Sequence, residues 1–149
     1  MNSILLARPH PFIVAEMAPL LAVLGFNPVR LESLAHLESS VEASWRGAII
    51  SLAISSSVGA TAAEVVQALR AKVPRLPLAF AGMVPMDTAA SSIKRLFDGQ
   101  PPAVADVDSQ RRQARPLGGT DTCLYFSKAQ IGDPAMQAEI RKMMAAHFR

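Results

Sequence analysis

Short apolar runs alternate along the chain with longer stretches in which apolar residues recur every three or four positions. The short runs are typical of buried strands, and the longer stretches are typical of helices with one buried face. Strands are predicted at residues 4–7, 29–31, 48–54, 76–81 and 123–126. Because helices separate them, the strands must run parallel, with right-handed crossovers and helices on both faces. The pattern therefore predicts a doubly wound, five-stranded parallel α/β sheet.

Local signals place the helices between these strands. The periodic stretch at residues 13–24 predicts a helix that ends at Gly25, with a kink or a late start at Pro19. Thr61 and Glu64 have the spacing of a capping box, so a helix is expected directly after them. Further helix starts are indicated at Ser33, at Asp87 and at Asp133-Pro134.

Composition narrows the class of protein. A chain of 149 residues with 50% hydrophobic residues fits one domain over residues 1–149, whether it stands alone or belongs to a longer protein. The single cysteine, Cys123, excludes an internal disulfide and a cysteine-rich zinc site. No apolar run approaches 18 residues and no basic, apolar leader begins the chain, so we expect a cytoplasmic protein without a membrane partner.

The segment 100–120 interrupts the alternation because it is rich in Pro, Gly, Asp and Arg. We interpret it as a solvated loop inserted before the last strand, with residues 103–107 as a candidate short strand inside it. It carries Arg111, Arg112 and Arg115, but neighbouring aspartates offset these charges. With a formal net charge of only +3, direct nucleic-acid binding is not favoured.

In an open parallel sheet, ligands bind at the carboxyl ends of the strands, so the loops after the strands carry the candidate chemistry. Residues 4–7 and 48–51 resemble the first and third strands of the receiver domain of bacterial two-component response regulators. Gly59 lies where that family keeps a glycine eight residues after its phosphoacceptor, and Tyr125 and Lys128 match its aromatic residue and, three positions later, its lysine. The likeness covers roughly residues 4–147 and implies a flavodoxin-like fold.

The same resemblance shows what this chain lacks. The family accepts a phosphoryl group on an aspartate, which an acidic pair helps to hold Mg²⁺, and a hydroxyl residue then contacts the phosphate. Here Ser51 stands at the phosphoacceptor position, Arg8 and Pro9 replace the acidic pair, and Gly82 replaces the hydroxyl residue. The resemblance therefore implies a receiver domain without aspartyl phosphate chemistry, a type often called a pseudo-receiver.

The absence of carboxylates does not depend on the alignment. Residues 1–15 contain no Asp or Glu, and neither do residues 43–63, so no shift of register restores the acids. A serine hydroxyl without a base is a poor phosphoacceptor, and no nearby motif supplies a base. We therefore expect neither an enzyme nor a bound metal or other cofactor at these strand ends.

Two functions remain. The first is a phosphorylation-independent, receiver-like signalling domain that acts through protein–protein contact in a bacterial two-component-type pathway, with self-association into a homodimer as one mode. The alternative is a regulatory module that binds a small anion or nucleotide between Arg8, Ser51 and Lys128. His10, His36 and Cys123 fit plain structural roles better than ligand or nucleophile roles, because no partner group is placed beside them.

Overall fold

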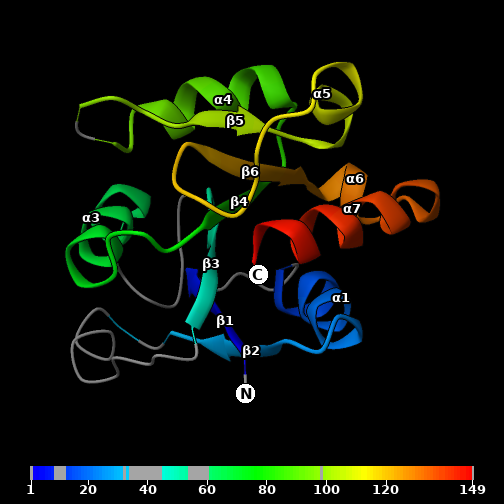
Figure 1. Ribbon diagram of the computed structural model, residues 1–149, viewed down its shortest axis with the longest axis horizontal. Helices are drawn as coiled ribbons and strands as arrows, with labels where there is room; N and C mark the ends of the chain where they lie inside the picture. The colour runs from blue at the N-terminus through cyan, green and yellow to red at the C-terminus, as the bar shows by residue number, and fades with distance from the viewer. Residues whose placement is uncertain are drawn as a thin grey trace.

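A computed structural model of the chain describes residues 2–8, 13–31, 33, 45–53, 61–97 and 99–148. At its centre is a six-stranded, wholly parallel sheet with the order β2-β1-β3-β4-β6-β5 (Figure 1). This confirms the doubly wound parallel α/β architecture that the hydrophobic pattern predicts. The strands are β1 (Ser3–Arg8), β2 (Asn27–Arg30), β3 (Trp45–Ser51), β4 (Leu78–Gly82), β5 (Ala103–Ala105) and β6 (Thr122–Ser127).

Helices cover both faces of the sheet. Figure 1 shows α1 and α7 on one side of the strands and α3 and α4 on the other. The helical segments are the π-helix η1 (Ile13–Met17), α1 (Ala18–Val23), α3 (Ala62–Lys72), α4 (Met86–Lys94), α5 (Val107–Arg112), α6 (Lys128–Ile131) and α7 (Pro134–His147). The helix predicted from Ser33 onward lies outside the described residues, apart from Ser33 itself.

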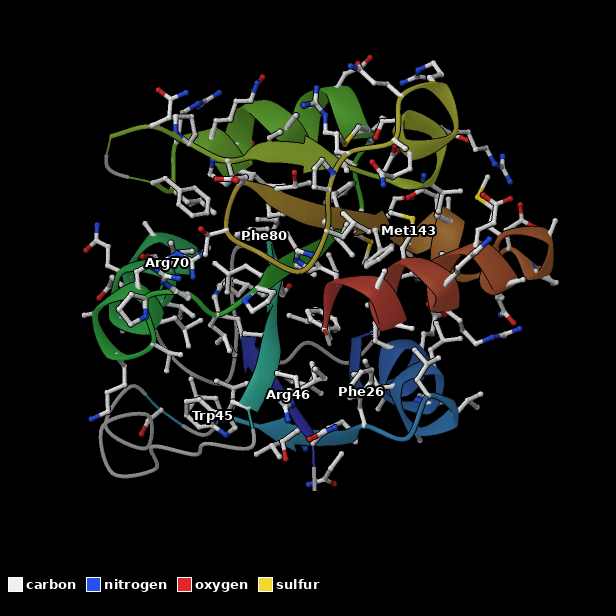
Figure 2. All side chains as sticks on the ribbon, in the orientation of Figure 1. Phe26, Trp45, Arg46, Arg70, Phe80 and Met143 are labelled. Atoms are coloured by element: carbon white, nitrogen blue, oxygen red, sulfur yellow. The ribbon has the colours of Figure 1, made fainter. Side chains whose placement is uncertain are left out.

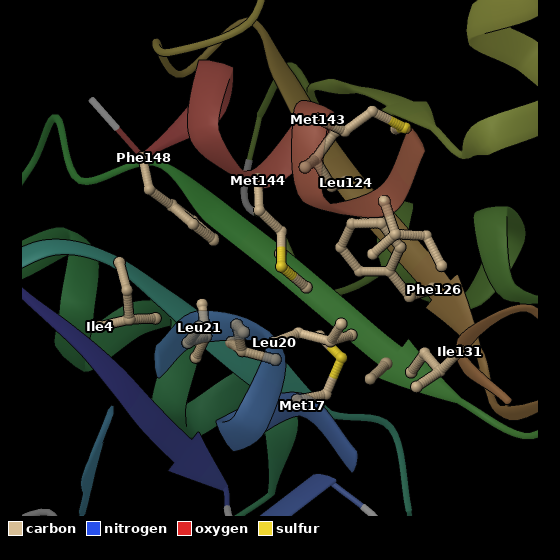
Figure 3. Packing of buried hydrophobic residues seen from close by; sticks show 14 of the residues in the cluster. Ile4, Met17, Leu20, Leu21, Leu124, Phe126, Ile131, Met143, Met144 and Phe148 are labelled. Carbon is tan, nitrogen blue, oxygen red and sulfur yellow. The ribbon is translucent and has the colours of Figure 1, made fainter. Parts of the chain in front are cut away.

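Alternating side chains of the strands feed two separate cores. In β1, Ile4 and Leu6 belong to the core under α1 and α7, whereas Leu5 and Ala7 belong to the core under α3 and α4. This period of two follows from the pleat of a strand, and burial on both faces explains why the central strands are apolar throughout. Figure 3 shows the first core, where Phe148, Met144 and Leu21 close over the sheet.

The helix starts follow the sequence signals in most cases. Thr61 and Glu64 form a reciprocal capping box at α3, and Asp133 caps α7 through the amide of Ala135. The kink expected at Pro19 is a change from the π-helix η1 to α1, with Pro19 in the first turn of α1. The start predicted at Asp87 is slightly wrong, because Pro85 is the N-cap of α4 and Asp87 lies in its first turn.

The segment 100–120 is more ordered than an inserted loop. It holds β5 and α5, and β5 pairs with β6 as a sixth strand at the outer edge of the sheet. The count of five strands is therefore one short, because three apolar residues give too weak a periodic signal to establish a strand. Asp106 and Ser109 form the capping box that starts α5 directly after this short strand.

Arg111, in this segment, forms ion pairs rather than extending freely into solvent. Arg111 donates hydrogen bonds to both carboxylate oxygens of Glu139 on α7 and lies 3.5 Å from Asp108. Exposed pairs of this kind contribute little stability, but they hold α5 beside α7. The positive charge at Arg111 is therefore balanced within the fold.

The end of α7 fastens the inserted segment to the sheet. His147 is fully buried; its Nδ1 accepts a hydrogen bond from the amide of Gly118 at 3.1 Å, and its Nε2 lies 2.9 Å from the carbonyl oxygen of Leu78. Since Nδ1 accepts, Nε2 must carry the proton and donate it to Leu78. The imidazole thus joins the loop before β6 to the first residue of β4 in its neutral form.

No helix within the described residues is long and apolar enough to cross a membrane.

Candidate functional site

The candidate residues lie at the carboxyl ends of the central strands. Arg8 ends β1, Ser51 ends β3, Gly82 ends β4, and Lys128 directly follows β6. The register pairs Arg8 with Ile50, Ser51 with Ala81, and Gly82 with Ser127, so these strand ends form one edge. The predicted grouping at a single edge therefore holds for the described candidates, whereas Pro9 and His10 lie outside the described residues.

Arg8 lies inside the protein at this edge. Its side chain is only 3% exposed, and its Nη1 donates a hydrogen bond to the carbonyl oxygen of Ser51 at 2.7 Å. An irregularity in the pairing of β1 with β3 falls between Leu6 and Arg8. Burial lowers the pKa of Arg8, but a guanidinium keeps its charge in proteins. A protein cation thus contacts the end of β3, where the receiver resemblance would place a metal ion.

The hydroxyl of Ser51 is committed to the local backbone. Ser51 is fully buried, and its Oγ accepts a hydrogen bond from the amide of Ala53 at 3.0 Å. Within the described residues no histidine or carboxylate hydrogen bonds to this hydroxyl, so nothing there removes its proton. Activation of a serine nucleophile requires such a base. The geometry gives Ser51 the role of a turn residue.

Gly82 leaves room for the hydroxyl of Tyr125. Tyr125 is fully buried in β6, and its Oη donates a 2.6 Å hydrogen bond to the carbonyl oxygen of Val84, in the loop after β4. A Cβ atom at position 82 would lie 3.0 Å from that Oη, closer than such atoms normally approach. Burial raises the pKa of Tyr125, so the phenol remains a neutral donor. The aromatic ring is thereby held inward at this edge.

A Gly82→Ala substitution tests this arrangement. The new methyl group must push the Tyr125 hydroxyl away from Val84, and we expect a loss of about 1–2 kcal/mol of unfolding free energy in urea. In a Tyr125→Phe background the hydroxyl is absent, so the same substitution should cost clearly less. An equal cost in both backgrounds would show that Tyr125 does not depend on the space at Gly82.

Lys128 is at the same edge but is separate from the Arg8–Ser51 contact. It is the first residue of α6, its side chain is exposed, and it forms no ion pair with any described residue. Its strand, β6, is two positions from β3 in the sheet, which is a lateral separation of about 10 Å. The structure therefore brings Arg8 and Ser51 into contact, and the three-residue anion pocket stays a prediction.

Asp106 is a buried polar residue at this edge that the sequence does not mark as a site residue. Asp106, which follows β5, is only 3% exposed; its Oδ1 caps α5, and its Oδ2 accepts a hydrogen bond from Gln130 at 3.0 Å. Gln130 in turn forms the capping box of α6 with Ser127. The Asp–x–x–Ser spacing at positions 106 and 109 could have revealed the cap, but not the partner from another helix. Asp106 is three strands from Ser51, so it supplies no base there.

Cys123 has no chemical role in this arrangement. It is buried within β6 and free, and burial raises the pKa of its thiol to about 12. At pH 8 this leaves roughly one thiol in 10,000 as the reactive thiolate. Among the described residues, no group of three or more His, Cys, Asp or Glu side chains is arranged to hold a metal ion.

Thiol labelling is therefore expected to report global unfolding. Native protein at pH 8 should react with dithionitrobenzoate only at the rate at which it unfolds, whereas protein in concentrated urea should react at once. Rapid labelling without denaturant would contradict the burial of Cys123.

Comparison with known proteins agrees with the fold and leaves the family open. No protein-family model matches the chain, and no curated protein matches it by sequence. A solved structure does resemble it: the response regulator receiver protein from Pseudoalteromonas atlantica, with a TM-score of 0.51 and 10% sequence identity. The match covers 96% of this chain and 95% of the other. The chain has a receiver-type fold.

The candidate residues share one edge of this fold. Arg8, Ser51, Gly82 and Lys128 occur at the ends of neighbouring strands of the central sheet, and the receiver positions assigned to them stay a prediction. The edge strand β5 and helix α5 extend this sheet beyond the five strands predicted. The residues at the edge, rather than the fold, then decide what chemistry the domain can perform.

Proposed function

We propose that the protein is a receiver-like signalling domain that works without phosphorylation, through contact with a protein partner. The observation that carries this proposal is the contact of Arg8 with Ser51, in which a buried guanidinium donates to the carbonyl at the phosphoacceptor position. A cation fixed there opposes Mg²⁺, and residues 1–15 and 43–63 provide no carboxylate to attract it.

The inward position of Tyr125 supports a single conformation of this edge. The hydroxyl donates a hydrogen bond to the carbonyl oxygen of Val84, and Gly82 provides the space for it. We expect a domain held by these contacts to present this surface without a covalent modification. Its signal would then depend on where and when the partner is present, rather than on a covalent switch.

The loop after β4 offers a contact surface of suitable chemistry. Met83 is 61% exposed and Val84 is 39% exposed, although both are apolar, and Pro85 beside them is also exposed. Adjacent exposed apolar side chains often mark a protein-binding surface. Because Tyr125 holds the backbone of Val84, this loop is ordered for binding before a partner arrives.

Incubation with acetyl phosphate and Mg²⁺, followed by intact-mass measurement, tests the loss of phosphorylation. We expect no added phosphoryl group under conditions that phosphorylate an active receiver domain included as a control. A labile gain of one phosphoryl group would overturn the proposal. Titration with Mg²⁺ alone should likewise leave the amide resonances of Arg8 and Ser51 unshifted.

The exposed loop after β4 can be tested through self-association, because a homodimer needs no second protein. We expect sedimentation velocity to show concentration-dependent dimers that Met83→Ser weakens. Val23→Ser changes an even more exposed apolar residue, on α1, and should leave the dimers intact. If Lys128→Ala instead abolishes a stabilisation by phosphate, the alternative anion site accounts for this edge better.

A further inference from the structure

A groove of about 680 Å³ lies at the opposite edge of the sheet from the residues discussed so far. It is bounded by the end of α3, by the residues that follow α4, and by the residues that lead into β5 and β6. All of these segments precede parallel strands, so the groove lies at the amino edge. Its volume is in the range of sites that take small organic molecules.

Arg70 gives this groove a cation. The side chain projects from α3 (Figure 2), and its Nη1 donates a 2.6 Å hydrogen bond to the carbonyl oxygen of Leu76. A guanidinium has five N–H donors, so this contact orients the group and leaves other donors for a ligand. Among the described residues no carboxylate lies within ion-pair distance of Arg70. Its half-buried position strengthens any contact with an anion, because less water competes.

Phe97 gives the groove a fixed aromatic wall. Its ring packs edge-to-face against Phe80 in the sheet, with ring centroids 6.2 Å apart. A ring held in this way loses little conformational entropy when a ligand packs on it. Gln67, Gln100 and Thr120 also line the groove, and their amide and hydroxyl groups are of the kind that hydrogen bond to a heteroaromatic ring.

Asp121 limits the charge of the ligand. It is the only acidic residue among the described residues that line the groove, and Arg70 is the only basic one. A second negative charge on the ligand would meet the Asp121 carboxylate without a second cation to balance it. The chemistry therefore favours one negative charge together with a flat ring that carries hydrogen-bonding atoms.

We propose that this groove is a binding site for a planar heteroaromatic monoanion, with the anionic group on Arg70 and the ring against Phe97. The site is distinct from the edge at Arg8 and Ser51, and it does not depend on the loss of phosphorylation. A ligand there would contact α3, the residues that follow α4 and the residues that lead into β5 and β6 at once, and would stabilise this side of the sheet.

Amide chemical-shift titration with two probes tests the site: adenosine 3′,5′-cyclic monophosphate and indole-3-carboxylate, both monoanions. We expect at least one of them at millimolar concentration to give saturable shifts at Val66, Arg70, Phe97 and Thr120. Inorganic phosphate and uncharged adenosine each lack half of the chemistry and should give none. Absence of saturable shifts with both monoanions, or shifts at Ser51 and Lys128 instead, would overturn the proposal.

Substitutions in the groove test which residues contact the probe. Arg70→Gln should weaken binding about tenfold or more, whereas Arg75→Gln, which removes the same charge from an exposed residue outside the lining, should not change it. If Arg70→Gln unfolds, Gln100→Ala still tests the site, because Gln100 is exposed and lies outside every helix and strand. Unchanged affinity in Arg70→Gln, or in Gln100→Ala when Arg70→Gln does not fold, would contradict the proposal.

Asp121→Asn separates charge selection from general affinity. With the carboxylate removed, adenosine 5′-monophosphate, which carries about one more negative charge, should bind as well as the cyclic monoanion. If the wild-type protein already binds both equally, Asp121 does not face the ligand and the assigned charge preference is wrong.

Discussion

An Arg8→Asp variant is expected to lose roughly 3 kcal/mol or more of unfolding free energy in urea or guanidinium. The substitution restores the type of residue that the receiver resemblance implies at this position, but it does so in a site built for a cation. The new carboxylate would be buried at the end of β1 on a shorter side chain, and the carbonyl oxygen of Ser51 would lose the hydrogen bond that it accepts from Arg8. A buried negative charge would then lack a cation, and a buried carbonyl would lack a donor; both are costly.

Two matched variants separate charge from shape. Arg8→Met keeps an unbranched side chain without the charge and leaves the Ser51 carbonyl without its donor, so its loss should be smaller than that of Arg8→Asp, about 1–2 kcal/mol. Arg8→Lys keeps the charge and should lose less than Arg8→Asp. Addition of Mg²⁺ at millimolar concentration should not restore Arg8→Asp. Wild-type stability in Arg8→Asp, or recovery with Mg²⁺, would show that the edge still accepts a metal ion and would count against the proposed function.

The predictable part of the fold depends on signals that extend over many residues. Burial on both faces of β3 and β4 appears as continuous apolar runs, and the capping box of Thr61 and Glu64 marks the start of α3 within one residue. The parallel architecture follows from these runs and from the helices between them, because a parallel connection needs a crossover. Such features survive small errors in element boundaries.

The edge strand β5 is indicated in the sequence only as the candidate short strand at residues 103–107, for a physical reason. It contains three residues, Ala103–Ala105, and its stability comes from pairing with β6 and from the Asp106 cap that follows. Both contributions come from tertiary structure, whereas the local sequence is dominated by the prolines and charges on either side. The strand order β4-β6-β5 is likewise invisible in the sequence, since it depends on which edge the added strand joins.

The candidate site divides in the same way. The absence of carboxylates from residues 1–15 and 43–63 is visible in the sequence itself and does not depend on the three-dimensional structure. The direction of the Arg8 side chain could not be predicted from the sequence, since an arginine at a strand end can point either outward or inward. Its hydrogen bond to Ser51 indicates that the guanidinium has a structural role rather than the role of an anion-binding group. The bond from Tyr125 to Val84 also needed coordinates, because 41 residues separate the two along the chain.

Acid is expected to weaken the fold through His147. Burial lowers the pKa of this imidazole below its ordinary value of 6.5, so the unfolded chain binds a proton more readily than the folded protein. The stability that depends on the neutral ring is therefore complete above pH 6.5, and it is lost as the pH falls from 6.5 through the lowered folded-state pKa. Within that window the slope should approach about 1.4 kcal/mol per pH unit for one proton. Protonation of Nδ1 would also abolish its hydrogen bond from Gly118.

Chemical denaturation between pH 5 and pH 7.5 measures this effect, and two variants assign it. His147→Gln does not titrate and keeps one donor and one acceptor, so the slope near pH 6 should disappear. A variant with both other histidines changed, His10→Asn and His36→Asn, should keep the slope. His147→Leu leaves the Gly118 amide and the Leu78 carbonyl without their partner and should cost roughly 3 kcal/mol at pH 7.5. If the slope persists in His147→Gln, the acid sensitivity belongs to other groups, and the joint between the inserted segment and β4 does not depend on a neutral imidazole.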